Sequence, residues 1–185
     1  MALVGSNPFE IGQSAPEFEL YDTVSGQNKS LTQLQGSQGT AIFFICNHCP
    51  YVVHINHALV QMANDYLPKG INFIAISSND VRYYPQDGPE RMKQLAEQLQ
   101  YPFPYLYDET QEVAKAYNAS CTPDLYLFDA ELKAVYHGRF DESRPGSGIA
   151  VTGNDFRAAM DFMLKGEAYP YPQQASVGCS IKWKR

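Results

Sequence analysis

The sequence of 185 residues is poor in charge, in cysteine and in long hydrophobic runs, and each shortage excludes a class of protein. Charged residues make up 18%, and Asp plus Glu exceed Lys plus Arg by 20 to 14. The resulting net charge of −6 argues against nucleic acid or an anionic membrane surface as the main partner. Four cysteines are too few for a disulfide scaffold, although they are enough for chemistry.

Hydrophobic runs are short throughout the sequence. The longest strictly apolar one, Ala41–Cys46, is far below the roughly 20 residues that a membrane helix needs. Residues 1–20 contain no Lys or Arg and no apolar core, so they lack the pattern of a secretory signal. We therefore expect a cytoplasmic protein with no membrane partner, whose thiols are mostly reduced.

Length and composition are those of one packed domain. Apolar residues make up 44%, which is enough for a hydrophobic core without metal or disulfide support. We predict a single domain over residues 1–185, with a core at about residues 10–165 and a tail at residues 166–185.

The hydrophobic pattern predicts an α/β fold. Strand-like runs occupy residues 17–20, 41–45, 71–77, 125–128 and 132–136. Helix signals occupy residues 30–34, 50–67, 89–99, 110–117 and 156–164. Helices between the middle strands imply crossover connections with parallel pairing, whereas the last two strands can form an antiparallel hairpin. The expected fold is a central mixed sheet flanked by helices.

The segment Cys46-Asn47-His48-Cys49 lies between a predicted strand and the helix that begins near Pro50. A thiol at a helix N-terminus meets free N–H groups and the helix dipole, which stabilise the nucleophilic thiolate. We expect Cys46 to be exposed and to attack, and Cys49 to be partly covered by the first helical turn and to resolve the mixed disulfide. A protonated His48 would tune Cys46. No Asp, Glu, Lys or Arg occurs between Lys29 and Asp65, so no carboxylate nearby in sequence destabilises a thiolate.

The helix predicted at residues 50–67 offers an alternative chemistry. Its apolar stripe consists of Val52, Ile55, Leu59, Met62 and Tyr66. Its polar stripe carries His54 and His57, which with Cys46 and Cys49 supply four candidate zinc ligands. The spacing between Cys49 and His54 is too short for them to converge if both lie on one helix. We therefore predict no metal and no cofactor, and a non-catalytic metal-binding carrier remains an alternative.

Three motifs in order carry a family resemblance. They are Gly12-x-x-Ala15-Pro16-x-Phe18-x-Leu20, Cys46-x-x-Cys49-Pro50 and Cys121-Thr122-Pro123. Together they resemble the thioredoxin-fold superfamily, and most closely the branch that groups alkyl hydroperoxide reductase/thiol-specific antioxidant proteins with thioredoxin-like disulfide reductases. The resemblance implies a central sheet flanked by helices and a cis Thr122–Pro123 peptide facing the cysteine pair. Thr122 and Pro123 would then shape a substrate groove with backbone groups free to align an extended chain.

The sequence departs from the peroxiredoxin pattern Pro-x-x-x-Thr/Ser-x-x-Cys. Counting back from Cys46 gives Phe43 and Gly39, and counting back from Cys49 gives Cys46 and Ile42. The hydroxyl that helps to hold a peroxide is therefore missing, which favours dithiol exchange and leaves a thiol peroxidase or antioxidant protein as an alternative. No Trp precedes Cys46, because the single Trp is Trp183, so the electron donor is not identified.

The roles of two further cysteines stay open. Cys121, two residues before Pro123, has three candidate roles: a third redox thiol, a modulator of the pair, or a small packed side chain. Cys179 lies in the tail, where Ile181 and Trp183 could dock it near the active site or a partner chain. We favour a free thiol in the tail for Cys179.

The predicted function is thiol–disulfide exchange by the pair Cys46 and Cys49. The expected partners are a disulfide-bearing protein or small-molecule substrate and an unidentified thiol electron donor, with no nucleic acid and no membrane. Such an enzyme would contribute to cell redox homeostasis.

Overall fold

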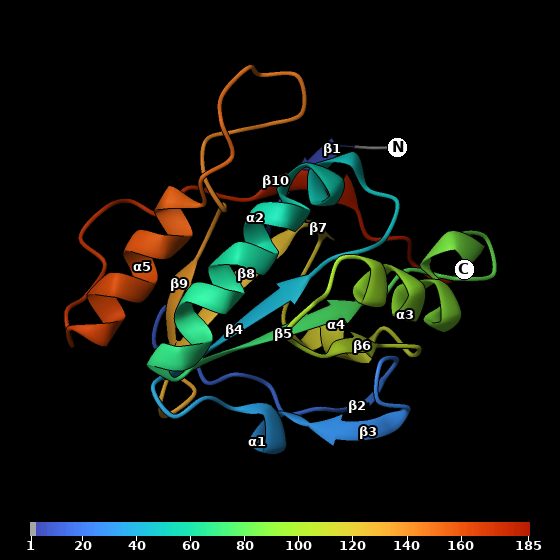
Figure 1. The fold of residues 1–185 in the computed structure, drawn as a ribbon, viewed down its shortest axis with the longest axis horizontal. Coiled ribbons are helices and arrows are strands. Elements are labelled where there is room, and N and C mark those ends of the chain that lie inside the picture. Colours follow the sequence, from blue (N-terminus) through green and yellow to red (C-terminus); the bar gives the residue numbers. More distant parts are fainter. Residues whose placement is uncertain (1–2) are drawn as a thin grey trace.

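The computed structural model describes residues 3–185, and its centre is a mixed sheet of seven strands (Figure 1). Its strands in spatial order are β3 (Gln27–Ser30), β2 (Glu19–Asp22), β6 (Tyr105–Tyr107), β5 (Ile71–Ser77), β4 (Gly39–Phe44), β8 (Asp124–Asp129) and β9 (Ala134–His137). The pairs β4–β5 and β5–β6 are parallel, and all other neighbours are antiparallel. The predicted mixed sheet is confirmed.

The central strand β4 is buried on both faces because helices or loops cover each of them. Side chains alternate along a strand, so Ala41 and Phe43 enter one apolar cluster while Ile42 and Phe44 enter the other. This alternation fixes the register of β4, since a slip of one residue would exchange the two clusters.

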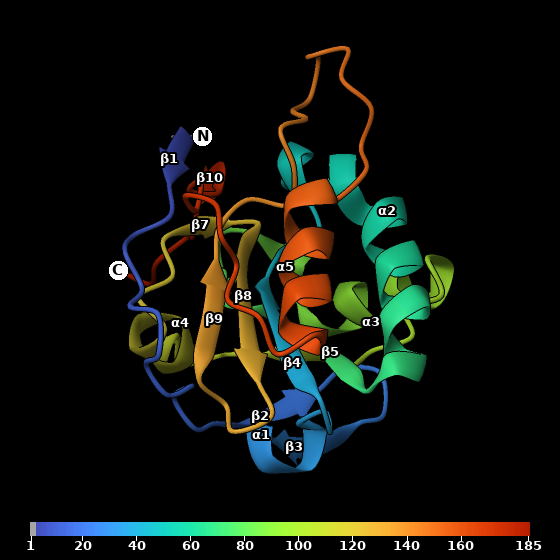
Figure 2. The ribbon, with the colours of Figure 1, turned by 90° about the vertical axis from the view of Figure 1, so that its left-hand side faces the viewer.

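Helices on the two faces differ in length. The longer ones, α2 (Pro50–Tyr66), α3 (Pro89–Gln98) and α5 (Asn154–Leu164), cover one face (Figure 2). The short α1 (Leu31–Leu34) and α4 (Glu112–Ala116) contribute to the other, and Leu67–Lys69 and Pro85–Asp87 form 3₁₀ turns. The stripe predicted for α2 is buried as expected. None of the helices in residues 3–185 is long and apolar enough to cross a membrane.

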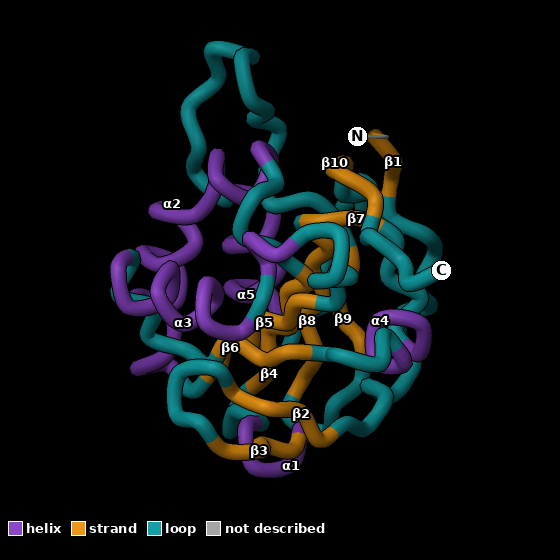
Figure 3. The backbone as a smooth tube through the Cα atoms, turned by 90° about the vertical axis from the view of Figure 1, so that its right-hand side faces the viewer, coloured by secondary structure: helices purple, strands orange, loops and turns teal. Residues whose placement is uncertain are grey.

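A second sheet joins distant parts of the chain. Its strands are β1 (Leu3–Gly5), β10 (Val177–Ser180) and β7 (Cys121–Thr122), in that order and all antiparallel (Figure 3). Strand β10 was not expected, because its sequence Val-Gly-Cys-Ser has neither the length nor the alternation of a predictable strand. The tail is therefore partly a structured element, and it lies against β7.

Gly178 in β10 is required by the close approach of β7. A Cβ atom added there would overlap the backbone oxygen of Thr122, whereas one added at Gly5 in β1 would lie 3.7 Å from its nearest neighbour. We predict that Gly178→Ala lowers the free energy of unfolding by about 1–3 kcal/mol, because β10 must shift away from β7 to make room for the methyl group.

Gly5→Ala is the matched control, and its free energy of unfolding should stay within about 0.5 kcal/mol of that of the wild type. Urea unfolding measures both, and equal stabilities for the two variants would contradict the proposed packing.

Candidate redox site

The two cysteines of the predicted pair lie in the short connection between β4 and α2. Cys49 is the N-cap residue of α2, and Pro50 is the first helical residue. Proline fits this position because its missing N–H would have no helical partner there. The expected placement of the pair at a helix N-terminus is confirmed. The expected exposure of Cys46 is wrong, since Cys46 is 1% exposed and Cys49 is 0% exposed.

Strand register brings Thr122 to the cysteine pair. Strands β4 and β8 are antiparallel with Phe44 opposite Asp124, so continuing both chains by two residues places Cys46 opposite Thr122. The Thr122 hydroxyl lies 3.5 Å from the Cys46 sulfur, and the Cys49 thiol donates to the Thr122 carbonyl oxygen over 3.1 Å. The Thr122–Pro123 peptide is cis, as the resemblance implied.

The two thiols titrate as a linked pair, because each changes the pKa of the other. Their interaction lowers the pKa at which the pair loses its first proton and raises the pKa for the second proton, to which burial and the Asp87 carboxylate add. The Thr122 carbonyl can only accept, so it favours the remaining proton on Cys49. The Thr122 hydroxyl can donate to Cys46, so it favours negative charge there.

His48 lies beside Cys46, as expected for a residue that tunes it. The His48 Nδ1 atom is 3.9 Å from the Cys46 sulfur and 2.6 Å from the Asp87 carboxylate, and its ring stacks on Tyr84. The other ring nitrogen, Nε2, is buried without a hydrogen-bond partner in the described structure.

Asp87 is the residue that the sequence did not reveal. Its carboxylate is buried and accepts hydrogen bonds from the Asn47 backbone N–H at 2.9 Å and from the Asn79 side chain at 2.8 Å, besides its contact with His48. In the sequence Asp87 is an ordinary polar residue of a loop between β5 and α3. Only the folded chain brings this loop to the cysteine pair.

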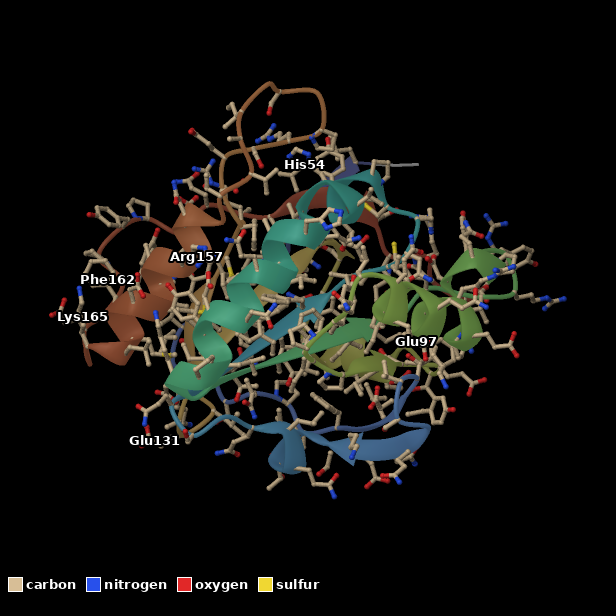
Figure 4. All side chains as sticks on the ribbon, viewed as in Figure 1. His54, Glu97, Glu131, Arg157, Phe162 and Lys165 are labelled. Carbon is tan, nitrogen blue, oxygen red and sulfur yellow. The ribbon has the colours of Figure 1, made fainter. Side chains whose placement is uncertain are left out.

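The zinc ligand set considered from sequence does not assemble. His54 contacts the Ser143 hydroxyl at 3.0 Å, below the protruding loop that follows β9, and His57 is exposed (Figure 4). Among residues 3–185, the cluster with metal-binding geometry is Cys46, His48 and Asp87, whose ligand atoms lie within 4.8 Å of one another.

The predicted groove beside Thr122 is already occupied. Thr122 pairs with Cys179 of β10, so the backbone expected to align an extended substrate is used by the tail of the same chain. The favoured expectation for Cys179 is confirmed in one respect, since its thiol is free of any disulfide. It is wrong in that the cysteine does not lie in an undocked tail, because Cys179 is 6% exposed and packs in the same apolar cluster as Cys46 and Cys49. Cys121 is buried as well, and its thiol contacts the Pro123 carbonyl oxygen at 3.6 Å.

This fold and site define the class of protein: an α/β protein of the thioredoxin fold with a thiol pair at a helix N-terminus. The chain belongs to the AhpC/TSA family, whose model matches residues 11–137. The expected superfamily and branch are thereby confirmed.

Solved structures agree with this assignment. An uncharacterized conserved protein from Geobacillus kaustophilus is 56% identical with a TM-score of 0.97, and the match covers 100% of this chain and 97% of that one. A hypothetical protein from Sinorhizobium meliloti 1021 is 44% identical with a TM-score of 0.94, over 97% and 98% of the two chains. The thioredoxin domain of a thiol-disulfide oxidoreductase from Bacteroides vulgatus shares the fold at 19% identity, with a TM-score of 0.62 over 81% and 97%. No match was found among curated proteins.

The linked titration of the pair leads to a test. We predict that reduced protein forms one thiolate at a pH below the ordinary cysteine value of about 8.5, and loses it only when the pH falls through this lowered pKa. The Cys49→Ala variant lacks the partner thiol and its interaction, so burial should move thiolate formation at Cys46 to a higher pH. The ultraviolet absorbance of thiolate measures this. Cys121→Ala is the control, since burial raises the pKa of Cys121 and its removal leaves the early step unchanged. Identical titrations for wild type and Cys49→Ala would contradict the linkage.

Proposed function

We propose that this protein is a thiol–disulfide oxidoreductase that uses Cys46 and Cys49. The observation that carries the proposal is the convergence of both sulfurs on Thr122, which supplies one hydrogen-bond donor and one acceptor. The family and the fold shared with a thiol-disulfide oxidoreductase domain support it. The low cysteine count supports a reducing compartment such as the cytoplasm as its place of action.

The reaction starts with Cys46. Its thiolate attacks one sulfur of a substrate disulfide and forms a bond to it, while the other substrate sulfur leaves as a thiolate and takes up a proton. Thr122 supports this step by donating to the Cys46 sulfur, and His48 contributes a second polar contact.

Cys49 completes the exchange. Cys49 loses its proton and attacks the Cys46 sulfur, so that the Cys46–Cys49 disulfide forms and the second substrate sulfur leaves with that proton. The two electrons that reduce the substrate come from the two cysteines. A thiol electron donor then returns two electrons to the pair.

Substrate size is constrained by the tail. Because β10 pairs with Thr122 and covers the place of an extended chain, a small-molecule disulfide meets less obstruction than a folded protein does. Both substrates still require a neighbouring segment to move, since Cys46 is almost fully buried.

The central test compares disulfide reduction by wild type and Cys46→Ser. We predict that wild type reduces oxidised glutathione and insulin faster than free thiols do, that glutathione is the better substrate, and that Cys46→Ser falls to the free-thiol rate. Cys121→Ser is the matched control and should retain the wild-type rate, because Cys121 contacts neither sulfur of the pair in the hydrogen-bond network. Equal rates for wild type and Cys46→Ser would refute the function.

A second candidate is hydroperoxide reduction. The peroxiredoxin pattern has a Thr or Ser hydroxyl three residues before the cysteine, and this sequence lacks it. The folded chain supplies a hydroxyl from another segment, since that of Thr122 lies beside the Cys46 sulfur. The family assignment is compatible with this activity.

The Thr122→Val variant separates the two candidates, because it removes the hydroxyl and keeps the shape and the carbonyl. If the protein is a peroxidase, wild type consumes hydrogen peroxide well above the free-thiol rate. The rate of Thr122→Val is then at least about tenfold lower than that of wild type, which corresponds to the loss of one hydrogen bond to a charged group.

We expect the other result, in which wild type consumes hydrogen peroxide at the free-thiol rate. A faster rate would favour the peroxidase.

A further inference from the structure

Strand pairing places a third sulfur next to the cysteine pair. Cys179 lies directly opposite Thr122 in the β7–β10 ladder, and cross-strand partners point to the same side of a sheet. Thr122 is the residue whose hydroxyl contacts Cys46 and whose carbonyl oxygen accepts from Cys49. The three cysteines therefore surround one threonine, and all three belong to one apolar cluster.

The cysteine of the pair that lies on the side of Cys179 is Cys49. Cys179 stands opposite Thr122, whose carbonyl oxygen accepts from the Cys49 thiol, and helix α2 packs against β10. The two thiols also affect each other's acidity, since Cys179 lowers the pKa of Cys49. Cys46, in contrast, has its contacts with Cys49, His48 and Thr122. A thiol at this place can reach the Cys49 end of a Cys46–Cys49 disulfide, and Cys46 is then the leaving sulfur.

Cys121 does not share this position. It is the neighbour of Thr122 along β7, and successive side chains of a strand point to opposite faces. Its ladder partner is Ser180, and it is absent from the apolar cluster that holds the other three cysteines. The fold thus distinguishes two cysteines whose roles the sequence left open.

The residues that follow Cys179 have their own contacts with the domain. The backbone N–H of Lys182 donates to the Asn79 side chain at 2.9 Å, and that of Lys184 donates to the Gln111 side chain at 2.8 Å. Ile181 is buried in the second apolar cluster. These contacts follow Cys179 directly, so they fix the register of β10 against β7.

We propose that Cys179 is a third redox residue of this site, which exchanges with the Cys46–Cys49 disulfide to give a Cys49–Cys179 disulfide and a free Cys46. The proposal rests on the proposed dithiol function of the pair. It assigns a function to the position of the tail, because the new bond would join β10 covalently to the start of α2.

The exchange needs no external oxidant or reductant. The Cys179 sulfur bonds to the Cys49 sulfur, the Cys46–Cys49 bond breaks, and the electron pair of that bond leaves with Cys46. Burial raises the pKa of the Cys179 thiol to about 11, so it carries a proton at neutral pH. That proton passes to Cys46, and the protein stays oxidised by two electrons throughout.

The test uses the full-length Cys46→Ser variant, in which the proposed bond can form without competition. Diamide oxidises the reduced variant, free thiols are blocked with N-ethylmaleimide, and tryptic peptides are mapped without reduction. Cleavage after Lys and Arg puts Cys49 in peptide 30–69, Cys121 in peptide 116–133 and Cys179 in peptide 166–182, so each pairing gives a distinct mass. We expect the three thiols of the variant to fall to one, with peptides 30–69 and 166–182 joined.

Two double variants serve as matched controls. Adding Cys121→Ser should leave the cross-link intact, whereas adding Cys179→Ser should abolish it and leave two free thiols. Retention of all three thiols in Cys46→Ser, or a link from peptide 30–69 to peptide 116–133, would overturn the proposal. Near-ultraviolet circular dichroism confirms that each variant is folded.

Wild-type protein provides a second readout that does not depend on a substitution. Oxidised wild type quenched in acid should contain both the disulfide within peptide 30–69 and the link to peptide 166–182. If the link between peptides is missing while the disulfide within peptide 30–69 forms, only the role of Cys179 fails. If wild type forms no disulfide within peptide 30–69, the proposed dithiol function itself fails.

Discussion

The site depends on the contacts of one residue, Thr122. Its hydroxyl lies beside Cys46, its carbonyl oxygen accepts from Cys49, and its backbone pairs with Cys179. These partners come from the end of a central strand, the start of a helix and the tail, so one threonine holds together parts of the chain that are far apart in sequence. The antiparallel register of β4 and β8 sets its position, and that register is fixed in turn by two apolar clusters that would be exchanged by a slip.

Burial and polarity act against each other at the cysteine pair. Burial disfavours thiolate, and the Asp87 carboxylate adds to this effect at Cys46. The interaction between the two thiols works in the opposite direction, since it lowers the pKa for the first proton, so a buried pair can still supply a nucleophile. Asp87 is kept in place by the Asn47 backbone and the Asn79 side chain, which leaves His48 between a carboxylate and a sulfur.

Elements with a strong pattern of their own could be predicted from the sequence, and elements defined by their partners could not. Strand β5 and helix α2 have long apolar runs or stripes, and they lie where the pattern placed them. The strands β7 and β10 have two and four residues, and they exist because each completes the other's backbone hydrogen bonds. Cys46, Cys49 and His48 were recognisable because they are adjacent in sequence. Asp87 was not recognisable and the role of Cys179 stayed open, because only chain folding over long separations brings these two residues to the pair.

Access to Cys46 requires an element to move, and β10 has fewer ladder pairs to lose than β4. Strand β4 is paired along its whole length with β5 and β8, so its displacement would disrupt the core. Strand β10 has three paired residues with β1 and two with β7, and elements with few interactions open at a lower free energy. Detachment of β10 would free the Thr122 backbone and remove Cys179 from Cys49 in one movement. The pairing of Cys179 with Thr122 therefore has two effects: it covers the cysteine pair, and it places a third sulfur beside it. If the proposed exchange occurs, a Cys49–Cys179 disulfide would hold β10 in place, so the redox state of Cys179 would control substrate access.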